Sequence, residues 1–85
     1  MDIDSFKSAQ KVVGFNQTKK AAASGDALII YAASDADASF LAKVRTLAAS
    51  HGVPLDESDT KEHLGKACGI DVGCAVCAAV KSSNK

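Results

Sequence analysis

The sequence predicts an α/β fold in which one sheet lies between layers of helices. Segments with the apolar spacing of amphipathic helices alternate with short apolar runs of strand length, in the order α-β-α-β-α-β-α-β. The chain has 85 residues, which is the size of one small domain. Its composition, 47% hydrophobic but only 5% aromatic and rich in Ala, suits close packing of helices on a sheet. We therefore expect one domain over residues 1–80 and a polar tail over residues 81–85.

The first quarter of the chain predicts two helices joined by a short apolar step. The first helix spans Asp4–Lys11 and has its apolar residues on one side. The step is Val12–Val13. The second helix spans Asn16–Ser24 and is rich in Lys and Ala. It ends before Gly25, a residue type that commonly follows the last turn of a helix.

The middle of the chain predicts a strand, a helix and a second strand. Ala27–Ala33 is a continuous apolar run, typical of a central strand that is buried on both faces. An amphipathic helix follows and ends at His51–Gly52. Its apolar positions have helical spacing: Phe40, Leu41, Val44, Leu47 and Ala48. Val53–Ser58 is a shorter strand with Pro54 near its start, where a missing N–H is tolerated.

The last third predicts one more helix and one more strand. Asp59–Glu62 fits the capping-box pattern, with Asp59 as the N-cap. The helix runs to about Cys68 and ends at Gly69. Val72–Val80 is an apolar run, which we expect to form the last strand.

Charge and cysteine content limit the classes of function. Ten Lys and Arg balance ten Asp and Glu, which argues against a broad, non-specific nucleic-acid binder but leaves room for a small specific site. The sequence contains neither a membrane-spanning apolar run nor a secretory signal. Three cysteines are an odd number and do not make a disulfide framework, so we expect a reducing, cytoplasmic setting and no membrane partner.

The first candidate site is the stretch Gly14–Lys20. A helix start presents free N–H groups and a partial positive charge, which favour a phosphate or an electronegative base edge. Asn and Gln side chains both donate and accept hydrogen bonds, as the recognition of base edges requires. Lys20 lies one turn after Asn16 and Gln17 on the same face. The alternative interpretation is an ordinary capped and solvated helix start.

The second candidate site is the stretch Leu64–Gly73. Ile70 and Val72 fall in a predicted loop after Gly69. Apolar residues at the tip of a loop either pack inward or contact a partner. Both interpretations remain open from the sequence.

Three cysteines form the third candidate: Cys68, Cys74 and Cys77. The last two spell a CxxC motif inside a predicted strand, where residues i and i+3 point to opposite faces. A zinc site needs four ligands, and only His63 would complete the set. We therefore expect buried free thiols that pack as small apolar residues, with no metal and no cofactor.

The sequence contains no catalytic motif, and Asp35 and Asp37 are typical of helix caps rather than of paired catalytic carboxylates. The chain is therefore expected not to be an enzyme.

Read together, three motifs give the chain a resemblance to a known family. They are Gly14-x-Asn-Gln-x-x-Lys20, Asp35-Ala-Asp37 and Leu64-Gly-Lys-Ala-Cys-Gly-Ile-Asp-Val-Gly73. From about Ser5 to Val80 the chain resembles the ribosomal protein L7Ae/L30e family, and its short bacterial members in particular. The resemblance implies a three-layer α/β/α sandwich with a four-stranded mixed sheet and helices on both faces. It also implies binding of kink-turn RNA, a duplex sharply bent at a bulge flanked by sheared G·A pairs.

The resemblance implies roles for individual residues. In the family, an Asn-Glu-x-x-Lys set at the start of the second helix reads the guanines of the G·A pairs, and Asn16, Gln17 and Lys20 occupy those positions. Gly14 matches a glycine at which the RNA approaches the backbone closely. An apolar loop of the family covers the nucleotide extruded from the bulge, and its counterparts here are Ile70, Asp71 and Val72. Lys20 and Lys66 are suited to neutralising phosphates.

The sequence departs from the family pattern at three positions. Gln17 stands where Glu is usual, so its hydrogen bonds to guanine lack the strengthening effect of a charge. Lys19 stands where Thr is frequent and adds a possible phosphate contact, and Ala38 replaces a common Pro.

We expect a non-catalytic, monomeric RNA-binding protein whose target is ribosomal RNA, a riboswitch or another structured transcript. Two alternatives remain. One is a protein-interaction module of the same fold that has lost strong RNA binding, and the other is a thiol-redox or metal protein that uses the three cysteines.

Overall fold

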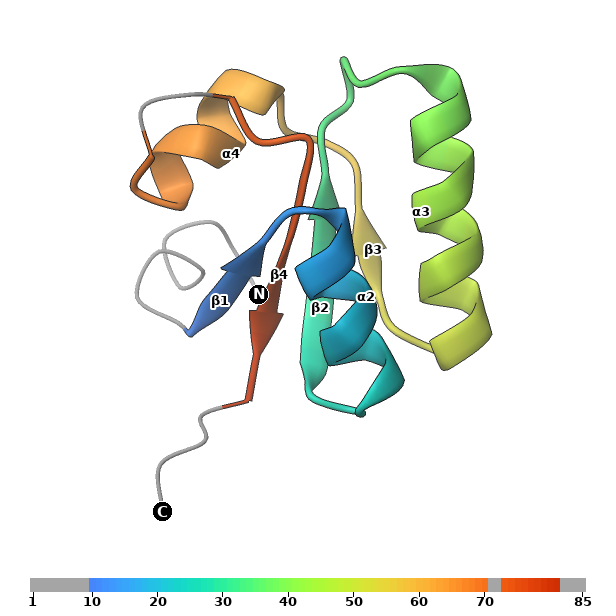
Figure 1. Ribbon diagram of the computed structural model, residues 1–85. Helices are drawn as coiled ribbons and strands as arrows, with labels where there is room; N and C mark the ends of the chain where they lie inside the picture. Colours follow the sequence, from blue (N-terminus) through green and yellow to red (C-terminus); the bar gives the residue numbers. More distant parts are fainter. Residues whose placement is uncertain (1–9, 71–72, 82–85) are drawn as a thin grey trace.

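A four-stranded mixed sheet forms the centre of the structure (Figure 1). The computed structural model describes residues 10–70 and 73–81. The strands are β1 (Lys11–Val13), β2 (Ala27–Ala32), β3 (Leu55–Asp56) and β4 (Val76–Val80). They lie in the order β1-β4-β2-β3, in which β4 pairs antiparallel with β1 and β2, and β2 pairs parallel with β3.

Helices cover both faces of this sheet: α2 (Phe15–Ala23), α3 (Ala38–His51) and α4 (Lys61–Ala67). Successive side chains of a strand point to opposite faces. On β2, Ile30 and Ala32 pack toward α3, against Val44, whereas Tyr31 packs toward α4, against Leu64. The start of α2 packs on the same face as α3. The predicted three-layer sandwich with a mixed sheet is confirmed.

Two elements follow the predictions closely. The second helix was expected over Asn16–Ser24 and spans Phe15–Ala23. The central strand was expected over Ala27–Ala33 and ends one residue earlier, at Ala32. The strand lies inside the sheet, but only its second half is buried on both faces, since Leu28 is 42% exposed.

Other boundaries differ from the predictions. Lys11 belongs to strand β1 and not to a helix, because it pairs with Ala79 of β4. The remainder of the predicted helix at residues 4–10 falls almost entirely outside the described residues. Strand β3 consists of Leu55–Asp56 and is shorter than the predicted Val53–Ser58. The N-cap of α4 is Thr60 and not Asp59, because the Thr60 hydroxyl accepts a hydrogen bond from the backbone N–H of His63.

The last strand begins at Val76, whereas the sequence predicted a start at Val72, which lies outside the described residues. Gly73 and Cys74 approach α4, whereas the carbonyl of Ala75 accepts a hydrogen bond from the N–H of Ala33, just after β2, over 2.8 Å. The backbone N–H of Cys74 donates to the carbonyl of Lys61 over 3.0 Å. A Cβ on Gly73 would lie 3.1 Å from the Cβ of Lys61, so a larger residue here would require a shift of a few tenths of an ångström.

Candidate functional site

The start of α2 is anchored on the central sheet. The Gly14 N–H donates to the carbonyl of Val76 at the beginning of β4, over 3.0 Å. Gly14 has φ 98° and ψ 157°, a conformation that is essentially restricted to glycine. A Cβ at this position would meet no atom within 4 Å, so the backbone conformation, and not lack of space, requires glycine here.

The first turn of α2 is open to an anionic or electronegative partner. Among the residues that the structure describes, no side chain caps the helix, and its first turn contains no acidic residue. Uncapped N–H groups and the helix dipole give such an end a partial positive charge. The side chains of Asn16, Gln17, Lys19 and Lys20 are exposed. Within residues 10–70 and 73–81, none of the four has a hydrogen-bond or ion-pair partner, so all four are available to a ligand.

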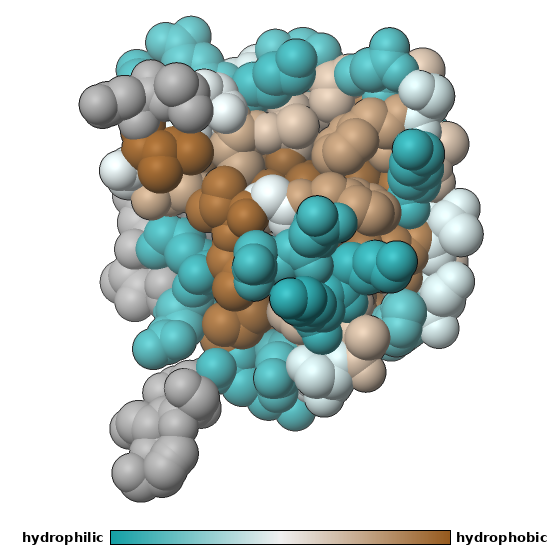
Figure 2. Space-filling view, viewed as in Figure 1, coloured by the Kyte–Doolittle hydropathy of each residue, from teal (hydrophilic) through white to brown (hydrophobic). Residues whose placement is uncertain are grey.

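The opposite face of α2 holds the helix in place. Thr18, Ala21 and Ala22 are buried, and the Thr18 N–H donates to the Gly14 carbonyl over 3.0 Å. The Thr18 hydroxyl oxygen is itself buried without a partner in the described part of the chain. Because one face of α2 is buried, the side chains of the predicted site residues on the other face point toward solvent. Figure 2 shows hydrophilic side chains over α2 beside hydrophobic atoms over β1, where Val13 is 38% exposed.

The exposed residues of α2 border two different hollows. Gln17 and Lys20, together with Lys81, line a hollow of about 360 Å³ beside the start of β1 and the end of β4. Lys19 faces the other way, toward α3. The structure therefore places Gln17 and Lys20 on one side of the helix and separates Lys19 from them, whereas Asn16, which was predicted to share their face, lines neither of these two hollows.

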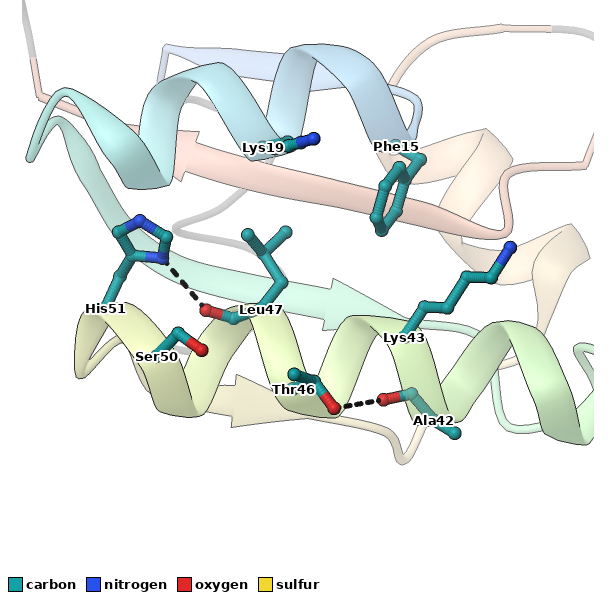
Figure 3. Close-up of a pocket in the computed structure, with 8 residues that line it drawn as sticks. All are labelled: Phe15, Lys19, Ala42, Lys43, Thr46, Leu47, Ser50 and His51. Atoms are coloured by element: carbon teal, nitrogen blue, oxygen red, sulfur yellow. Dashed lines mark hydrogen bonds between the residues drawn. The ribbon is translucent and has the colours of Figure 1, made fainter.

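Lys19 and Phe15 form one wall of a groove of about 490 Å³ between α2 and α3 (Figure 3). The other wall consists of α3 residues at helical spacing: Ala42, Lys43, Thr46, Leu47, Ser50 and His51. Phe15 also packs edge-on against Phe40, with ring centroids 5.8 Å apart. The sequence pattern shows the helical spacing of the α3 residues, but it contains no sign of the position of α2 against them and therefore none of this groove.

The second predicted stretch, Leu64–Gly73, begins inside α4 and continues past its end. Lys66 pairs with Glu62 over 3.6 Å, and both side chains are largely exposed, at 71% and 81%. Ile70 is partly buried and packs against the core cluster that contains Tyr31 and Leu64. Its N–H donates to the Gly65 carbonyl over 3.0 Å. Ile70 therefore packs inward in part, whereas the predicted site residues Asp71 and Val72 lie outside the described residues.

The carboxylates of the loop between β2 and α3 cap helices, as predicted. Asp37 is the N-cap of α3 and accepts from the N–H and the hydroxyl of Ser39, which holds the pKa of the Asp37 carboxyl below its usual value. Asp35 accepts from the N–H of Lys61, the first residue of α4, over 3.0 Å.

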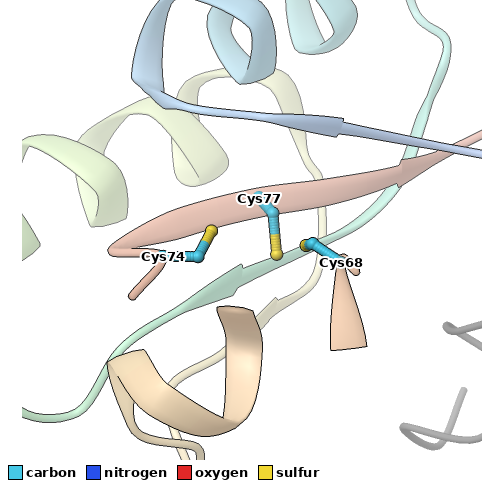
Figure 4. Close-up of side chains that lie close together, drawn as sticks. All are labelled: Cys68, Cys74 and Cys77. Atoms are coloured by element: carbon cyan, nitrogen blue, oxygen red, sulfur yellow. The ribbon is translucent and has the colours of Figure 1, made fainter. Parts of the chain in front are cut away.

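The directions of the cysteine side chains contradict the sequence prediction, although the expected free thiols are present, with Cys74 and Cys77 buried. Cys74 and Cys77 were expected on opposite faces of a strand, but their sulfurs and that of Cys68 all lie within 4.8 Å of one another (Figure 4). The reason is that Cys74 precedes β4, so the alternation of a strand does not apply to it. All three are free thiols.

The three thiols differ in acidity because they interact with one another. A hydrogen bond with Cys77 lowers the pKa of Cys74 to about 7. The same hydrogen bond and burial raise the pKa of Cys77. Burial raises the pKa of Cys68. The sequence missed this cluster because its three members come from different parts of the fold.

Comparisons with known proteins agree with the architecture. No helix in the described part of the chain is long and apolar enough to cross a membrane. An RNA-binding protein of Geobacillus sp. strain WCH70 is 40% identical over 76 residues, which cover 89% of this chain and 93% of that protein. The RNA-binding protein YbxF of Geobacillus stearothermophilus is 39% identical over 70 residues, which cover 82% of this chain and 85% of the relative.

Solved structures show the same fold. The Giardia lamblia 15.5kD RNA binding protein superposes with a TM-score of 0.80 at 26% identity, over 95% of this chain and 69% of that one. A protein of unknown function from Bacillus halodurans has a TM-score of 0.78 at 23% identity, over 86% of this chain and 73% of that one. Residues 4–85 match the model of the ribosomal protein L7Ae/L30e/S12e/Gadd45 family. The chain therefore belongs to the ribosomal protein L7Ae/L30e/S12e/Gadd45 family.

Proposed function

We propose that this chain is a non-catalytic RNA-binding protein that recognises a kink-turn, with the start of α2 as the reading element. One observation carries the proposal. Within the described part of the chain, the first turn of α2 has no side-chain cap; it contains no acidic residue, and its polar and basic side chains are exposed. Family membership and relatives that are named RNA-binding proteins support an RNA as the partner.

The start of α2 suits the sheared G·A pairs of a kink-turn. Sequence-specific proteins mostly read RNA where bases are splayed from a regular duplex. The amides of Asn16 and Gln17 can each donate and accept at a guanine edge. Lys20, one turn later, adds a positive charge on the same side as Gln17. At Gly14 the absence of a side chain lets RNA come close to the backbone.

The segment after α4 supplies the second part of the proposed interface. Ile70, Asp71 and Val72 cover the nucleotide extruded from the bulge. Ile70 contributes the part of its side chain that the core leaves exposed. Lys66 and Lys19 contact phosphates. The exposed ion pair of Lys66 with Glu62 contributes little stability, so Lys66 can exchange it for a phosphate at small cost.

A titration with two matched RNAs tests the proposal. The first RNA contains a kink-turn, and in the second the tandem G·A pairs are replaced by Watson–Crick pairs. We expect the chain to bind the first at least tenfold more tightly, because the second RNA lacks the splayed guanine edges. Equal affinity for both RNAs would contradict recognition of a kink-turn, whatever the absolute affinity.

A protein-interaction module is the second candidate function. The apolar-lined groove between α2 and α3 and the zero net charge favour it. In the same titration, this function predicts that the folded chain binds neither RNA.

For the RNA-binding function, we further propose that the protein acts as a monomer in the cytoplasm and that its target is a ribosomal RNA, a riboswitch or another structured transcript.

A further inference from the structure

The cluster of Cys68, Cys74 and Cys77 has no role in the proposed RNA interface. These are the three cysteines of the chain, and they come from the end of α4, from the segment before β4 and from β4 itself. Figure 4 shows the three side chains pointing toward one another, and their sulfurs lie within 4.8 Å of one another. Three thiol groups from separate segments, each a soft metal ligand, therefore lie close together.

We propose that these three thiols form a three-coordinate site for a soft metal ion, with Cu(I) as the expected occupant. With metal–sulfur bonds of about 2.3 Å, three sulfurs arranged evenly in a plane around an ion lie roughly 4 Å apart. The separations in the structure are at most 4.8 Å, so the sulfurs need to move together by less than about 1 Å. Small rotations of the side chains achieve this without a change of fold.

The number and type of ligands favour Cu(I) over Zn²⁺. Structural zinc sites have four ligands. Within residues 10–70 and 73–81, no histidine or carboxylate completes the group of three sulfurs. The Nδ1 atom of His63, the one histidine that the sequence suggested, instead lies 2.8 Å from the carboxylate of Asp59. Thiolates are soft ligands that select Cu(I), which does not require a fourth ligand here.

The surroundings of the cluster suit such a site. Cys74 and Cys77 are 3% and 0% exposed and pack with Tyr31 and Leu64, which keeps water away from the sulfurs. Cys68 is half-buried and forms the side from which an ion enters.

Binding exchanges protons for the metal and moves no electrons. As each sulfur–copper bond forms, the thiol releases its proton to solvent, and copper remains Cu(I). Three thiols and one Cu⁺ thus give one copper trithiolate and three protons.

A disulfide explains the cluster less well. A disulfide joins two sulfurs and leaves the third without a function. Thiol–disulfide exchange also requires that the attacking thiolate reach a sulfur of the pair. Cys74 and Cys77 are almost inaccessible, so a small ion can reach them more easily than a thiol reagent can.

A Cu(I) titration of the reduced, full-length chain under anaerobic conditions tests the site. A coloured Cu(I) chelator competes for the ion, and we expect the chain to withdraw one Cu(I) per molecule. Cys68→Ser should weaken Cu(I) binding at least tenfold. Because Cys68 is only half-buried, we expect this variant to fold, and circular dichroism checks that it does. His63→Asn is the control and should bind Cu(I) as tightly as the unmodified chain.

X-ray absorption of the loaded protein should show three sulfur neighbours at about 2.3 Å. The proposal is overturned if the unmodified chain fails to compete for Cu(I), if Cys68→Ser binds equally well, or if copper has fewer than three sulfur neighbours. Should Cys68→Ser not fold, Cys74→Ala replaces it with the same expected loss. The assay contains no RNA, so its result is independent of the proposed RNA binding.

Discussion

At the scale of single residues, the outer face of α2 combines two side chains with complementary chemistry. Gln17 offers a neutral amide, which both donates and accepts, and Lys20 offers a full positive charge on the same side of the helix. Neither side chain has a partner among the described residues. No internal contact therefore has to be broken when either binds a ligand, and substitutions at these positions report on binding rather than on folding.

Lys20→Ala should weaken kink-turn binding by about 1–3 kcal/mol, the usual size of a good contact to a base edge. Arg45→Ala is the matched control, because it removes the same charge. Arg45 lies on α3 and is held by Glu57 at 2.7 and 2.8 Å, away from the start of α2. We expect the control to bind like the unmodified chain in an RNA titration. Equal losses in both variants would mean that only net charge matters.

Gln17→Glu should bind kink-turn RNA at least as tightly as the unmodified chain, because a carboxylate accepts hydrogen bonds from guanine more strongly than an amide does. The same substitution should raise the melting temperature slightly, since an acidic residue in the first turn interacts favourably with the helix dipole. The two measurements are independent. A stabilised variant with tenfold weaker RNA binding would show that residue 17 does not accept hydrogen bonds from the RNA.

At the scale of elements, local signals and distant contacts determined different parts of the structure. The end of α2 near Gly25, the end of α3 at Gly52 and the extent of β2 follow from capping glycines and apolar runs, and they were predicted to within about one residue. The start of β4 depends instead on the hydrogen bond between Cys74 and Lys61, two residues far apart in the sequence. The sequence pattern contains no sign of that contact.

In the candidate site too, features set by the local sequence were predicted and features set by contacts between distant segments were not. The exposed face of α2 was predicted, because a single helix defines it. The groove between α2 and α3 and the convergence of three sulfurs were missed, because each depends on how separate elements pack. The strand was expected to begin at Val72 but begins at Val76, so the alternation of side chains along a strand does not extend to Cys74. For Cys74 the prediction failed for this reason.

The loop after α4 gives a prediction at the scale of elements. Ile70→Ala should lower the melting temperature, because Ile70 packs partly against the core. If the loop also covers an extruded nucleotide, both Ile70→Ala and Val72→Ala should lose about 1–3 kcal/mol of RNA binding in the folded fraction. A thermal melt and an RNA titration of each variant separate the two effects. Loss of stability with unchanged RNA affinity in both variants would remove this loop from the interface.

At the scale of the whole molecule, RNA binding must rely on a few well-placed charges, because the net charge is zero. Lys19, Lys20 and Lys66 are the proposed phosphate contacts. Each neutralised phosphate contributes roughly −0.7 to −0.9 to the slope of log affinity against log salt concentration, so three contacts give a slope of about −2 to −3. Titrations at several salt concentrations measure this slope. A value steeper than about −6 would indicate diffuse electrostatic binding instead of a specific site.

An amide NMR titration of the chain with kink-turn RNA tests the central claim most directly, because it reports binding and its location together. We expect the largest shifts in the backbone signals of Gly14–Lys20, with little change along the outer face of α3 around Arg45. Addition of the RNA with Watson–Crick pairs in place of the G·A pairs should leave the α2 signals in place. Binding that shifts α3 while the Gly14–Lys20 signals stay unchanged would contradict the assignment of α2 as the element that reads the RNA.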